Sequence, residues 1–424
     1  MTLLWEKNIK NLGYSTVEDT IDDTLAVEER YLFEESIAHQ DAAEITTGAL
    51  QPELTATSIS QGTNQPALTA DELNVLKNEF YRLEEKALVS SAIALFFDLL
   101  KKKEDVQAFP EIVQNLGKMI DIRMKDKDIK GAVEILQELK EISADYNTPE
   151  QAELIDAVVH KAGSPEKIGT LFRESIGVQD ITQYLSLLDQ TSVPDMILIL
   201  GELQEMKQRK LLCEILAAFG RHDVNIFSDA LNSEQWFLVR NIAMILGMTK
   251  EPAAVKQLEK AFRHPNFRVR REVVKALENI GSDDTKALFL VALNDEDFSI
   301  RLKALKALRR FKDPALLPIL KKNASIEELK KKPFEEKKEI LETLAALGGG
   351  SAFPVLSDLF RKKGFMEKDE ITEIRASAAY GLGVINTPEA LSLIEKETGS
   401  KKSMLREACI KALKEAQKSG NNRR

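Results

Sequence analysis

The sequence NFRVRREVVKALENIG, at residues 266–281, returns in altered form at a fixed distance along the chain. Residues 297–312 read DFSIRLKALKALRRFK and residues 235–249 read QWFLVRNIAMILGMT, so the three copies begin 31 residues apart. In each copy, apolar residues recur at intervals of three and four, as they do along one side of an α-helix. A period of about 30 residues predicts stacked helix pairs, because one pair cannot bury its apolar side alone.

Two positions in each copy are predicted to form the core. The first is a branched apolar residue near the start of the helix: Leu238, Val269, Ile300, Ile374 and Leu405. The second is a leucine that follows an alanine or glycine: Leu277, Leu308, Leu382 and Leu413. We expect the small residue to let neighbouring helices approach closely while the leucine fills the space beside it. Residues 335–349 supply a further copy, with insertions expected around 323–335 and 362–370.

This pattern resembles the HEAT repeat, in particular its short bacterial form, which is related to phycobilisome lyases. The resemblance is carried by VRREVVKALENIG (269–281), IRLKALKALRRFKD (300–313), IRASAAYGLGVIN (374–386) and LREACIKALKEA (405–416). It implies an all-α fold, an α-solenoid or superhelix of stacked antiparallel helix pairs. It also implies that the second helix of each pair lines a concave side.

The composition divides the chain into five segments. Residues 1–44 form an acidic N-terminal segment, and residues 45–70, rich in Thr, Ser, Gln, Ala and Pro, are predicted to be a flexible linker. Residues 71–206 are predicted to be a helical region with degenerate repeats, and residues 207–416 to be the HEAT-repeat array. Residues 417–424 are predicted to be a disordered basic tail.

The charge is distributed unevenly. Residues 250–424 carry 36 Lys and Arg against 26 Asp and Glu, a net charge of +10, so the total of −9 leaves −19 for residues 1–249. No Lys or Arg occurs between Tyr31 and Leu76. An acidic front and a basic rear favour either different partners for the two parts or a front that covers the rear.

The remaining composition points to a cytoplasmic protein. The two cysteines, Cys213 and Cys409, lie far apart in apolar helical stretches and are predicted to be reduced core residues. The longest nearly apolar run that we identify, residues 87–100, is too short to span a membrane, so we expect no membrane contact. No small-molecule substrate is evident from the sequence.

Motifs of catalysis are missing from the sequence. The four histidines show no metal-ligand spacing, and the His–Glu dipeptide that iron-holding HEAT-like hydroxylases use does not occur. The glycines at 348–350 lack the lysine of a phosphate-binding loop, and neither cysteine has a histidine nearby in sequence. We therefore predict no catalytic residue, no metal site and no cofactor, hence a protein that is not an enzyme.

Recurring arginines follow the first core position in four copies: Arg270, Arg301, Arg375 and Arg406. The resemblance implies a structural role for them, as partners of neighbouring loop acids such as Asp284 or Asp297. On this interpretation Arg301→Ala costs stability rather than affinity for a ligand.

A second basic set is predicted to lie on the outward side of the second helices, forming a stripe along the concave groove. Its members are Arg240, Arg271, Lys275, Lys303, Lys306, Arg309, Arg310 and Lys312. Such a stripe suits an acidic protein partner, a nucleic-acid backbone, the chain's own acidic N-terminal segment held by a high effective concentration, or solvent alone. Against nucleic acid stand the pI of about 5.4 and the lack of aromatic residues interleaved with the basic ones.

The sequence therefore favours a scaffold or adaptor that binds an acidic protein through a basic groove and is regulated by its own N-terminal segment. The alternative is nucleic-acid binding, as in some HEAT-like DNA glycosylases. A bilin lyase or isomerase is suggested by the subfamily resemblance alone, and no residue can be assigned to that chemistry.

Overall fold

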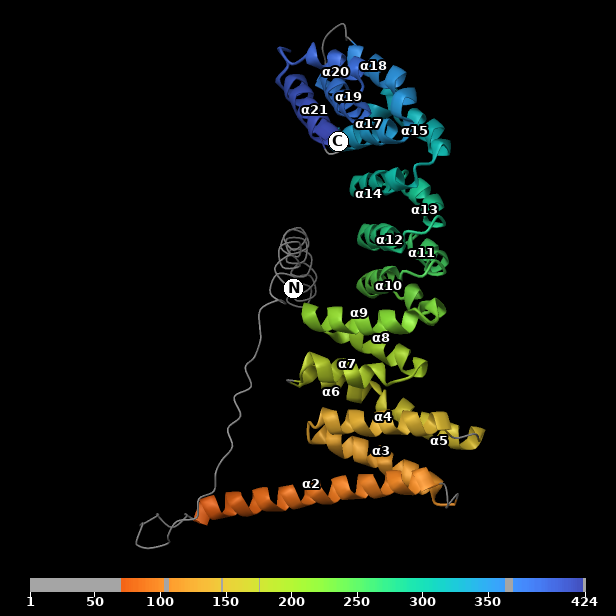
Figure 1. Cartoon of the computed structure of the whole chain (residues 1–424), viewed down its shortest axis with the longest axis vertical. Coiled ribbons are helices and arrows are strands. Elements are labelled where there is room, and N and C mark those ends of the chain that lie inside the picture. Colours follow the sequence, from red (N-terminus) through yellow and green to blue (C-terminus); the bar gives the residue numbers. More distant parts are fainter. Residues whose placement is uncertain (1–69, 103–106, 146–147, 175, 363–368, 422–424) are drawn as a thin grey trace, which may run out of the picture. The chain divides into compact units, whose positions relative to one another are not determined.

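The structure, a computed structural model, describes residues 70–102, 107–145, 148–174, 176–362 and 369–421 (Figure 1). The acidic segment 1–44 and the linker 45–70 lie outside these ranges, except for Ala70, the first residue of a helix. Every regular element in the described ranges is a helix. The predicted all-α fold is confirmed.

The helices before residue 236 are mostly short and closely spaced. They are α2 (Ala70–Lys102), α3 (Phe109–Lys125), α4 (Ile129–Asp145), α5 (Pro149–Ala162), α6 (Pro165–Arg173), α7 (Val178–Ser186), η1 (Gln190–Ser192), α8 (Val193–Glu202), α9 (Met206–Gly220), η2 (Val224–Phe227) and η3 (Ala230–Asn232). One compact unit begins at Val75, within α2, and includes all the helices that follow.

The helices after residue 235 carry the regular repeats. They are α10 (Trp236–Thr249), α11 (Ala254–Ala261), α12 (Phe267–Ile280), α13 (Thr285–Ala292), α14 (Phe298–Leu308), η4 (Arg309–Phe311), η5 (Pro314–Leu316), α15 (Leu317–Asn323), α16 (Ile326–Leu329), α17 (Phe334–Gly348), η6 (Gly349–Ala352), α18 (Phe353–Arg361), α19 (Asp369–Ile385), α20 (Pro388–Glu395) and α21 (Ser403–Asn421).

The helices of this unit stack in two rows. One row, here called the second-helix row, contains α9, α10, α12, α14, α17, α19 and α21, each packed on the next (Figure 1). The other row contains α11, α13, α15, α18 and α20, each packed against its partner in the first row. This is the α-solenoid of helix pairs that the repeat period predicts.

Neighbouring helices of the second-helix row run parallel and approach closely. A Cβ atom on Gly247 would lie 2.6 Å from the Cα of Ala276, and one on Gly383 would lie 3.0 Å from the Cβ of Ala412. Gly247, Ala276 and Gly383 lie in the C-terminal halves of their helices and Ala412 at the middle of the longer α21, so the N-terminal ends share the opposite edge. The small residues therefore set the helix spacing, as the sequence suggests.

The predicted core positions are mostly buried. Val269, Ile300, Ile374 and Leu405 are buried, as are Leu277, Leu308 and Leu382. Leu238 and Leu413 are only partly buried and pack against the core from its margin. In α10 the next residue, Val239, is fully buried instead, so this helix turns a slightly different side to the core.

Truncating Leu277 to alanine is expected to lower the free energy of unfolding by about 2–5 kcal/mol. The side chain has no exposed area and lies in the core between α12 and its neighbours, so its removal leaves a cavity. Urea denaturation followed by circular dichroism measures the difference. Lys275→Ala on the exposed side of the same helix is the control, and an equal loss in both variants would contradict the assignment.

One boundary differs from the prediction. Helix α21 continues to Asn421, so residues 417–421 are helical rather than part of a disordered tail. No proline follows Ala416, and the first glycine is Gly420, so nothing in the sequence stops the helix earlier. Within the first expected insertion, around 323–335, the structure has the short helix α16, and residues 363–368 of the second expected insertion lie outside the described ranges.

By length and composition, one described stretch could cross a membrane: Phe334–Arg361. It consists of α17, η6 and α18, and the backbone between the two longer helices passes through Gly349 with φ +49°. Helix α17 packs against α14, α15 and α19. The apolar character of this stretch therefore belongs to the core of the stack.

Candidate functional site

A row of basic residues connects the repeats near the starts of the second helices. It occupies the fourth residue of α9, α12, α14, α17 and α21 and one residue of α19, and we call it the cation ladder. Its members are Arg209, Arg270, Arg301, Lys337, Arg375 and Arg406. In α10 the corresponding residue is Val239, so the ladder is interrupted there.

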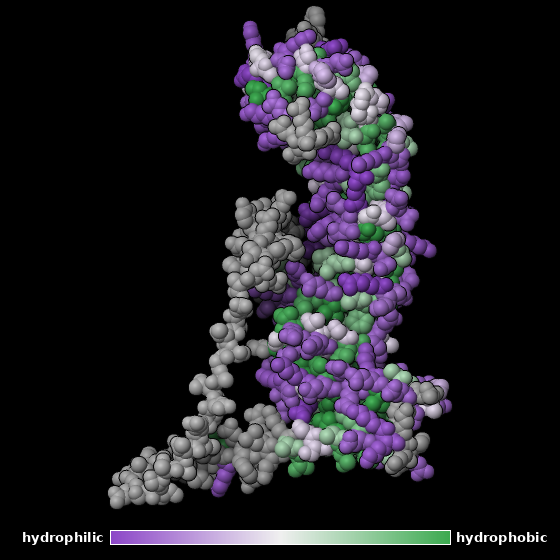
Figure 2. Space-filling view, in the orientation of Figure 1, coloured by the Kyte–Doolittle hydropathy of each residue, from purple (hydrophilic) through white to green (hydrophobic). Residues whose placement is uncertain are grey.

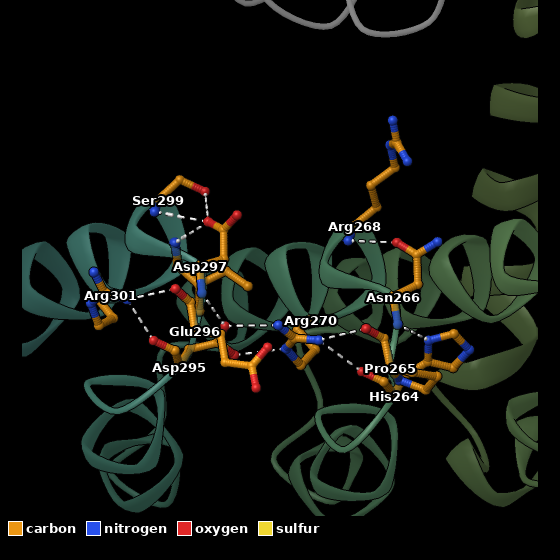
Figure 3. A network of polar contacts seen from close by, with 11 residues as sticks. His264, Pro265, Asn266, Arg268, Arg270, Asp295, Glu296, Asp297, Ser299 and Arg301 are labelled. Atoms are coloured by element: carbon orange, nitrogen blue, oxygen red, sulfur yellow. Dashed lines mark hydrogen bonds and ion pairs between the residues drawn. The ribbon is translucent and has the colours of Figure 1, made fainter. Parts of the chain in front are cut away.

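Arg270 shows what one step of the ladder does. Its Nη1 donates to the carbonyl oxygens of His264, at 3.1 Å, and Pro265, at 2.9 Å, in the loop before its own helix (Figure 3). Its Nε and Nη2 donate to the two carboxylate oxygens of Asp295, at 2.7 and 2.9 Å, in the next loop. One guanidinium thus fixes its own loop and ties it to the following repeat.

Arg301 repeats this arrangement at the next step. Its Nη1 donates to the carbonyl oxygens of Asp295 and Glu296, at 2.6 and 2.8 Å. Its Nε and Nη2 donate to the carboxylate of Glu336 in α17, at 2.8 and 2.6 Å.

Glu336 is the centre of a buried ion-pair cluster. Only 1% of its side chain is exposed, and it also accepts a hydrogen bond from Lys332 at 2.7 Å. Burial alone would raise the pKa of this carboxyl, but the hydrogen bonds from Arg301 and Lys332 outweigh burial and hold the pKa below its usual range.

The ladder's partners differ from those expected. Arg270 binds Asp295 rather than Asp284 or Asp297, and Asp297 instead caps α14 by accepting from the N–H groups of Ser299 and Ile300. Arg375 binds Glu397 and the carbonyl of Phe360. Arg406 donates to the carbonyl of Ser400. All four predicted arginines are held by contacts within the fold.

Two members of the ladder were not predicted from the sequence. Arg209 donates to the carbonyl oxygens of Leu203 and Gln204, six and five residues before it, as Arg270 and Arg301 do in their own loops. Lys337 is buried and binds Glu373. Both occupy the fourth position of their helix, and that position is the signal that would have identified them.

A second set of basic residues lies on the solvent-facing side of the second-helix row, away from the core. We call it the basic face, and its members are Lys210, Arg240, Arg271, Lys275, Lys303, Lys306 and Arg310. Lys210, Lys275, Lys306 and Arg310 are exposed, while the other three are half-buried. The face covers four successive helices, from α9 to η4 at the end of α14.

The helix register shows why these residues share one side. Lys210, Arg240 and Arg271 each stand four residues after the first residue of their helix, and Lys275 and Lys306 stand eight residues after it. Residues four apart lie above one another on a helix, and the helices run parallel. Equivalent positions therefore form rows that cross the stack from one helix to the next.

Two residues of the predicted stripe do not contribute to this face. Arg309 binds Glu339 at 2.5 Å, Glu342 at 3.2 Å and the hydroxyl of Thr343 at 3.0 Å, all on α17. Lys312 lies in the turn after η4, with φ +49°, and not on a helix side. Lys210 belongs to the face although the sequence did not indicate it, because α9 lacks the aromatic start that marks the regular copies.

Acidic residues limit the basic face. Helix α14 and η4 contain none, whereas α17 brings Glu339 and Glu342 to the same side. On α12 Glu272 lies near Lys275, with 3.8 Å between oxygen and nitrogen, and Glu278 is exposed one turn further on. On α9 the exposed Glu214 takes the helix position that Lys275 has in α12. In Figure 2 the stack around α12 and α14 is mostly hydrophilic, and hydrophobic residues are more frequent toward α8 and α9.

Aromatic residues lie one helical turn from the basic face, at the edge where the helices begin. Trp236, Phe267 and Phe298 are the first residues of α10, α12 and α14, and 47% of Phe298 is exposed. The Arg268 guanidinium carbon lies 5.4 Å from the ring centre of Trp236 and 5.1 Å from that of Phe267. Aromatic residues are not interleaved with the basic stripe in the sequence, but in the fold they lie beside it.

An open cleft of about 510 Å³ lies at this edge, between the starts of α12 and α14. It is lined by Pro265, Asn266, Phe267, Arg268, Arg270, Glu296 and Asp297. In Figure 3 the side chain of Arg268 extends away from the network around Arg270. The cleft joins the aromatic edge to the ladder but contains no reactive group beyond these.

The described residues hold no reactive cluster that the sequence overlooked. Among them, no group of three or more His, Cys, Asp and Glu could hold a metal ion. Cys213 and Cys409 are buried and unpaired, and burial raises the pKa of both thiols to about 12. Neither thiol is suited to act as a nucleophile at neutral pH.

Comparison with proteins of known structure gives distant likenesses. An engineered protein of known structure is 15% identical, over 77% of this chain and 99% of its own, with a TM-score of 0.29. Escherichia coli YibA is 16% identical, over 64% of this chain and 98% of its own, with a TM-score of 0.36. Human deoxyhypusine hydroxylase in complex with glycerol is 17% identical, over 62% and 99%, with a TM-score of 0.24.

These likenesses are too low to bear on function. A search of the curated proteins finds no match. The family model for HEAT repeats matches residues 256–328, the segment from α11 to α16 in which the 31-residue period is clearest. Residues 256–328 are therefore similar to HEAT repeats, and stacked helix pairs continue on both sides of this segment.

Proposed function

We propose that this chain is a non-enzymatic scaffold that binds an acidic segment of a partner protein through the basic face. The observation that carries the proposal is the placement of seven Lys and Arg residues on one side of four successive parallel helices. Such a surface attracts and orients an acidic ligand. A repeat array suits this role because it presents a long continuous surface.

Helix α14 favours an acidic ligand most directly. It places Lys303 and Lys306 on this side without any acid of its own to neutralise them.

Nucleic-acid binding is the alternative. The chain as a whole is acidic, with a pI of about 5.4, whereas domains that bind a nucleic-acid backbone are typically basic.

A binding experiment with defined polyanions separates the two functions. Fluorescence anisotropy of labelled poly-glutamate and of a labelled single-stranded oligothymidine is measured against the full chain at low and physiological salt. We expect poly-glutamate to bind more tightly and both affinities to fall as salt screens the charges. Tighter binding of the oligonucleotide would indicate that the basic face binds nucleic acid instead. No binding of either ligand would overturn the proposal.

The acidic N-terminal segment is proposed to compete for the basic face. A tethered ligand acts at a high effective concentration, so deleting residues 1–69 is expected to raise the affinity for poly-glutamate by about tenfold. Deletion of residues 1–15 removes few acids and is the control. Equal affinities of the full chain and the 1–69 deletion would contradict the competition and leave the scaffold proposal intact.

A further inference from the structure

The basic face has a repeat distance as well as a charge. Lys210, Arg240 and Arg271 take the same position in three successive parallel helices, so they are separated by the distance between helix axes. Packed helices lie about 8–10 Å apart. Across α9, α10, α12 and α14 there are three such intervals, about 24–30 Å in all.

The conformation of a ligand decides which of its residues can meet these positions. In a β-strand, residues on one side recur about every 6.7 Å, which is shorter than the distance between neighbouring helices. The residue after that on the same side is too far along to meet the next helix. In an α-helix the same side returns after seven residues, about 10.5 Å, which overshoots over three intervals. In a polyproline II helix every third residue lies on one side, with a spacing of about 9.3 Å, which fits.

The aromatic edge suits the same conformation. Trp236, Phe267 and Phe298 repeat with the same period as the basic residues and lie one turn away from them. Arg268 contacts the rings of Trp236 and Phe267 together, which fixes their positions before a ligand arrives. Proline-rich segments in the polyproline II conformation dock into grooves lined by such rings.

The limits of the face set the length of the ligand. Toward the C-terminus the carboxylates of Glu339 and Glu342 on α17 take up Arg309, so the attraction for acids ends after α14. Four helices with one contact each correspond to about ten residues of polyproline II chain, with acids at the first, fourth, seventh and tenth.

We propose that the scaffold recognises an acidic stretch in the polyproline II conformation, with an acidic residue at every third position and prolines between. It would cross the helices from α9 to α14, with its acids on the basic face and its prolines toward Trp236 and Phe267. This inference rests on the proposed function, since it names the ligand of the same face.

Two peptides of identical composition and length test the spacing. One has glutamate at positions 1, 4, 7 and 10 with proline and alanine between, and the other carries the same residues with the glutamates grouped together. The full chain is titrated with each peptide and with poly-glutamate, and binding is followed by anisotropy. We expect the regularly spaced peptide to bind about tenfold more tightly. In the grouped peptide the glutamates cannot each lie opposite a basic residue on a different helix, so charge pairs are lost.

The outcomes distinguish this inference from the proposed function. Equal affinities of the two peptides would overturn the spacing and leave an acid-binding scaffold. No binding of either peptide or of poly-glutamate would overturn both.

A second readout tests the aromatic edge. The chain has two tryptophans, so Trp5→Phe leaves Trp236 as its sole source of tryptophan fluorescence. The regularly spaced peptide is expected to shift this emission and to lose its advantage in Trp236→Ala, after an unchanged helical spectrum has been verified. An unchanged emission on binding would remove the aromatic edge from the proposed ligand site.

Discussion

Replacing Glu336 with alanine is expected to lower the free energy of unfolding by about 3–5 kcal/mol. The carboxylate is buried between Arg301 and Lys332, at 2.6 and 2.7 Å. Its removal leaves two basic groups that are mostly shielded from water without their partner, which costs more than the loss of an exposed pair. Urea denaturation of the variant and of the parent chain measures the difference.

Glu335→Ala is the matched control. Glu335 is the neighbouring residue and is exposed, and its substitution removes the same negative charge. We expect it to change the free energy of unfolding by less than about 0.5 kcal/mol. If both variants lose the same stability, the cluster around Glu336 does not hold α14 and α17 together.

The same carboxylate gives stability a dependence on acid. Because contacts in the folded state lower the pKa of Glu336, its contribution is present above the pKa of an unfolded glutamate. The contribution is lost as the pH falls through the lowered folded-state pKa. The parent chain should therefore lose more stability than Glu336→Ala between neutral pH and about pH 3.

Reversing two charges on the basic face is expected to weaken binding of poly-glutamate on the order of 100-fold. Arg271→Glu and Lys306→Glu replace residues on α12 and α14 that point to the solvent-facing side of the row. Each reversal removes an attraction and adds a repulsion. Helical content should stay unchanged, because neither side chain belongs to the core.

The control places the same charges on the other row of helices. Lys256→Glu with Lys260→Glu alters two exposed lysines of α11 and changes the net charge equally. Anisotropy at one salt concentration compares the two double variants. A similar loss in both would mean that poly-glutamate responds to net charge alone, and the basic face would then not be a specific site.

The repeat period predicts much of the fold because each copy must meet the same neighbours. The starts at Trp236, Phe267 and Phe298 coincide with the starts of α10, α12 and α14. The burial of Val269, Ile300 and Leu277 follows from the same spacing. Periodicity works here because local pattern and packing agree.

Contacts between unlike repeats could not be predicted in this way. Arg309 looks like another member of the basic stripe, but two glutamates of the next helix, α17, lie opposite it. Lys337 lies in the run EEKK, which gives no hint that one lysine is buried. The spacing of residues along the chain predicts on which side of its helix a residue lies. Which group the residue contacts depends on the helix that packs against that side.

The fixed period of 31 residues has a consequence for how this surface could change in evolution. Removing residues 267–297 would join Asn266 to Phe298, and Asn266 already caps a helix start as Asp297 does. Each repeat contributes one step of the basic face, so whole-repeat duplication or loss would lengthen or shorten the footprint by about three ligand residues. Such a protein can acquire a longer or shorter recognition motif by copying units, without inventing a new contact.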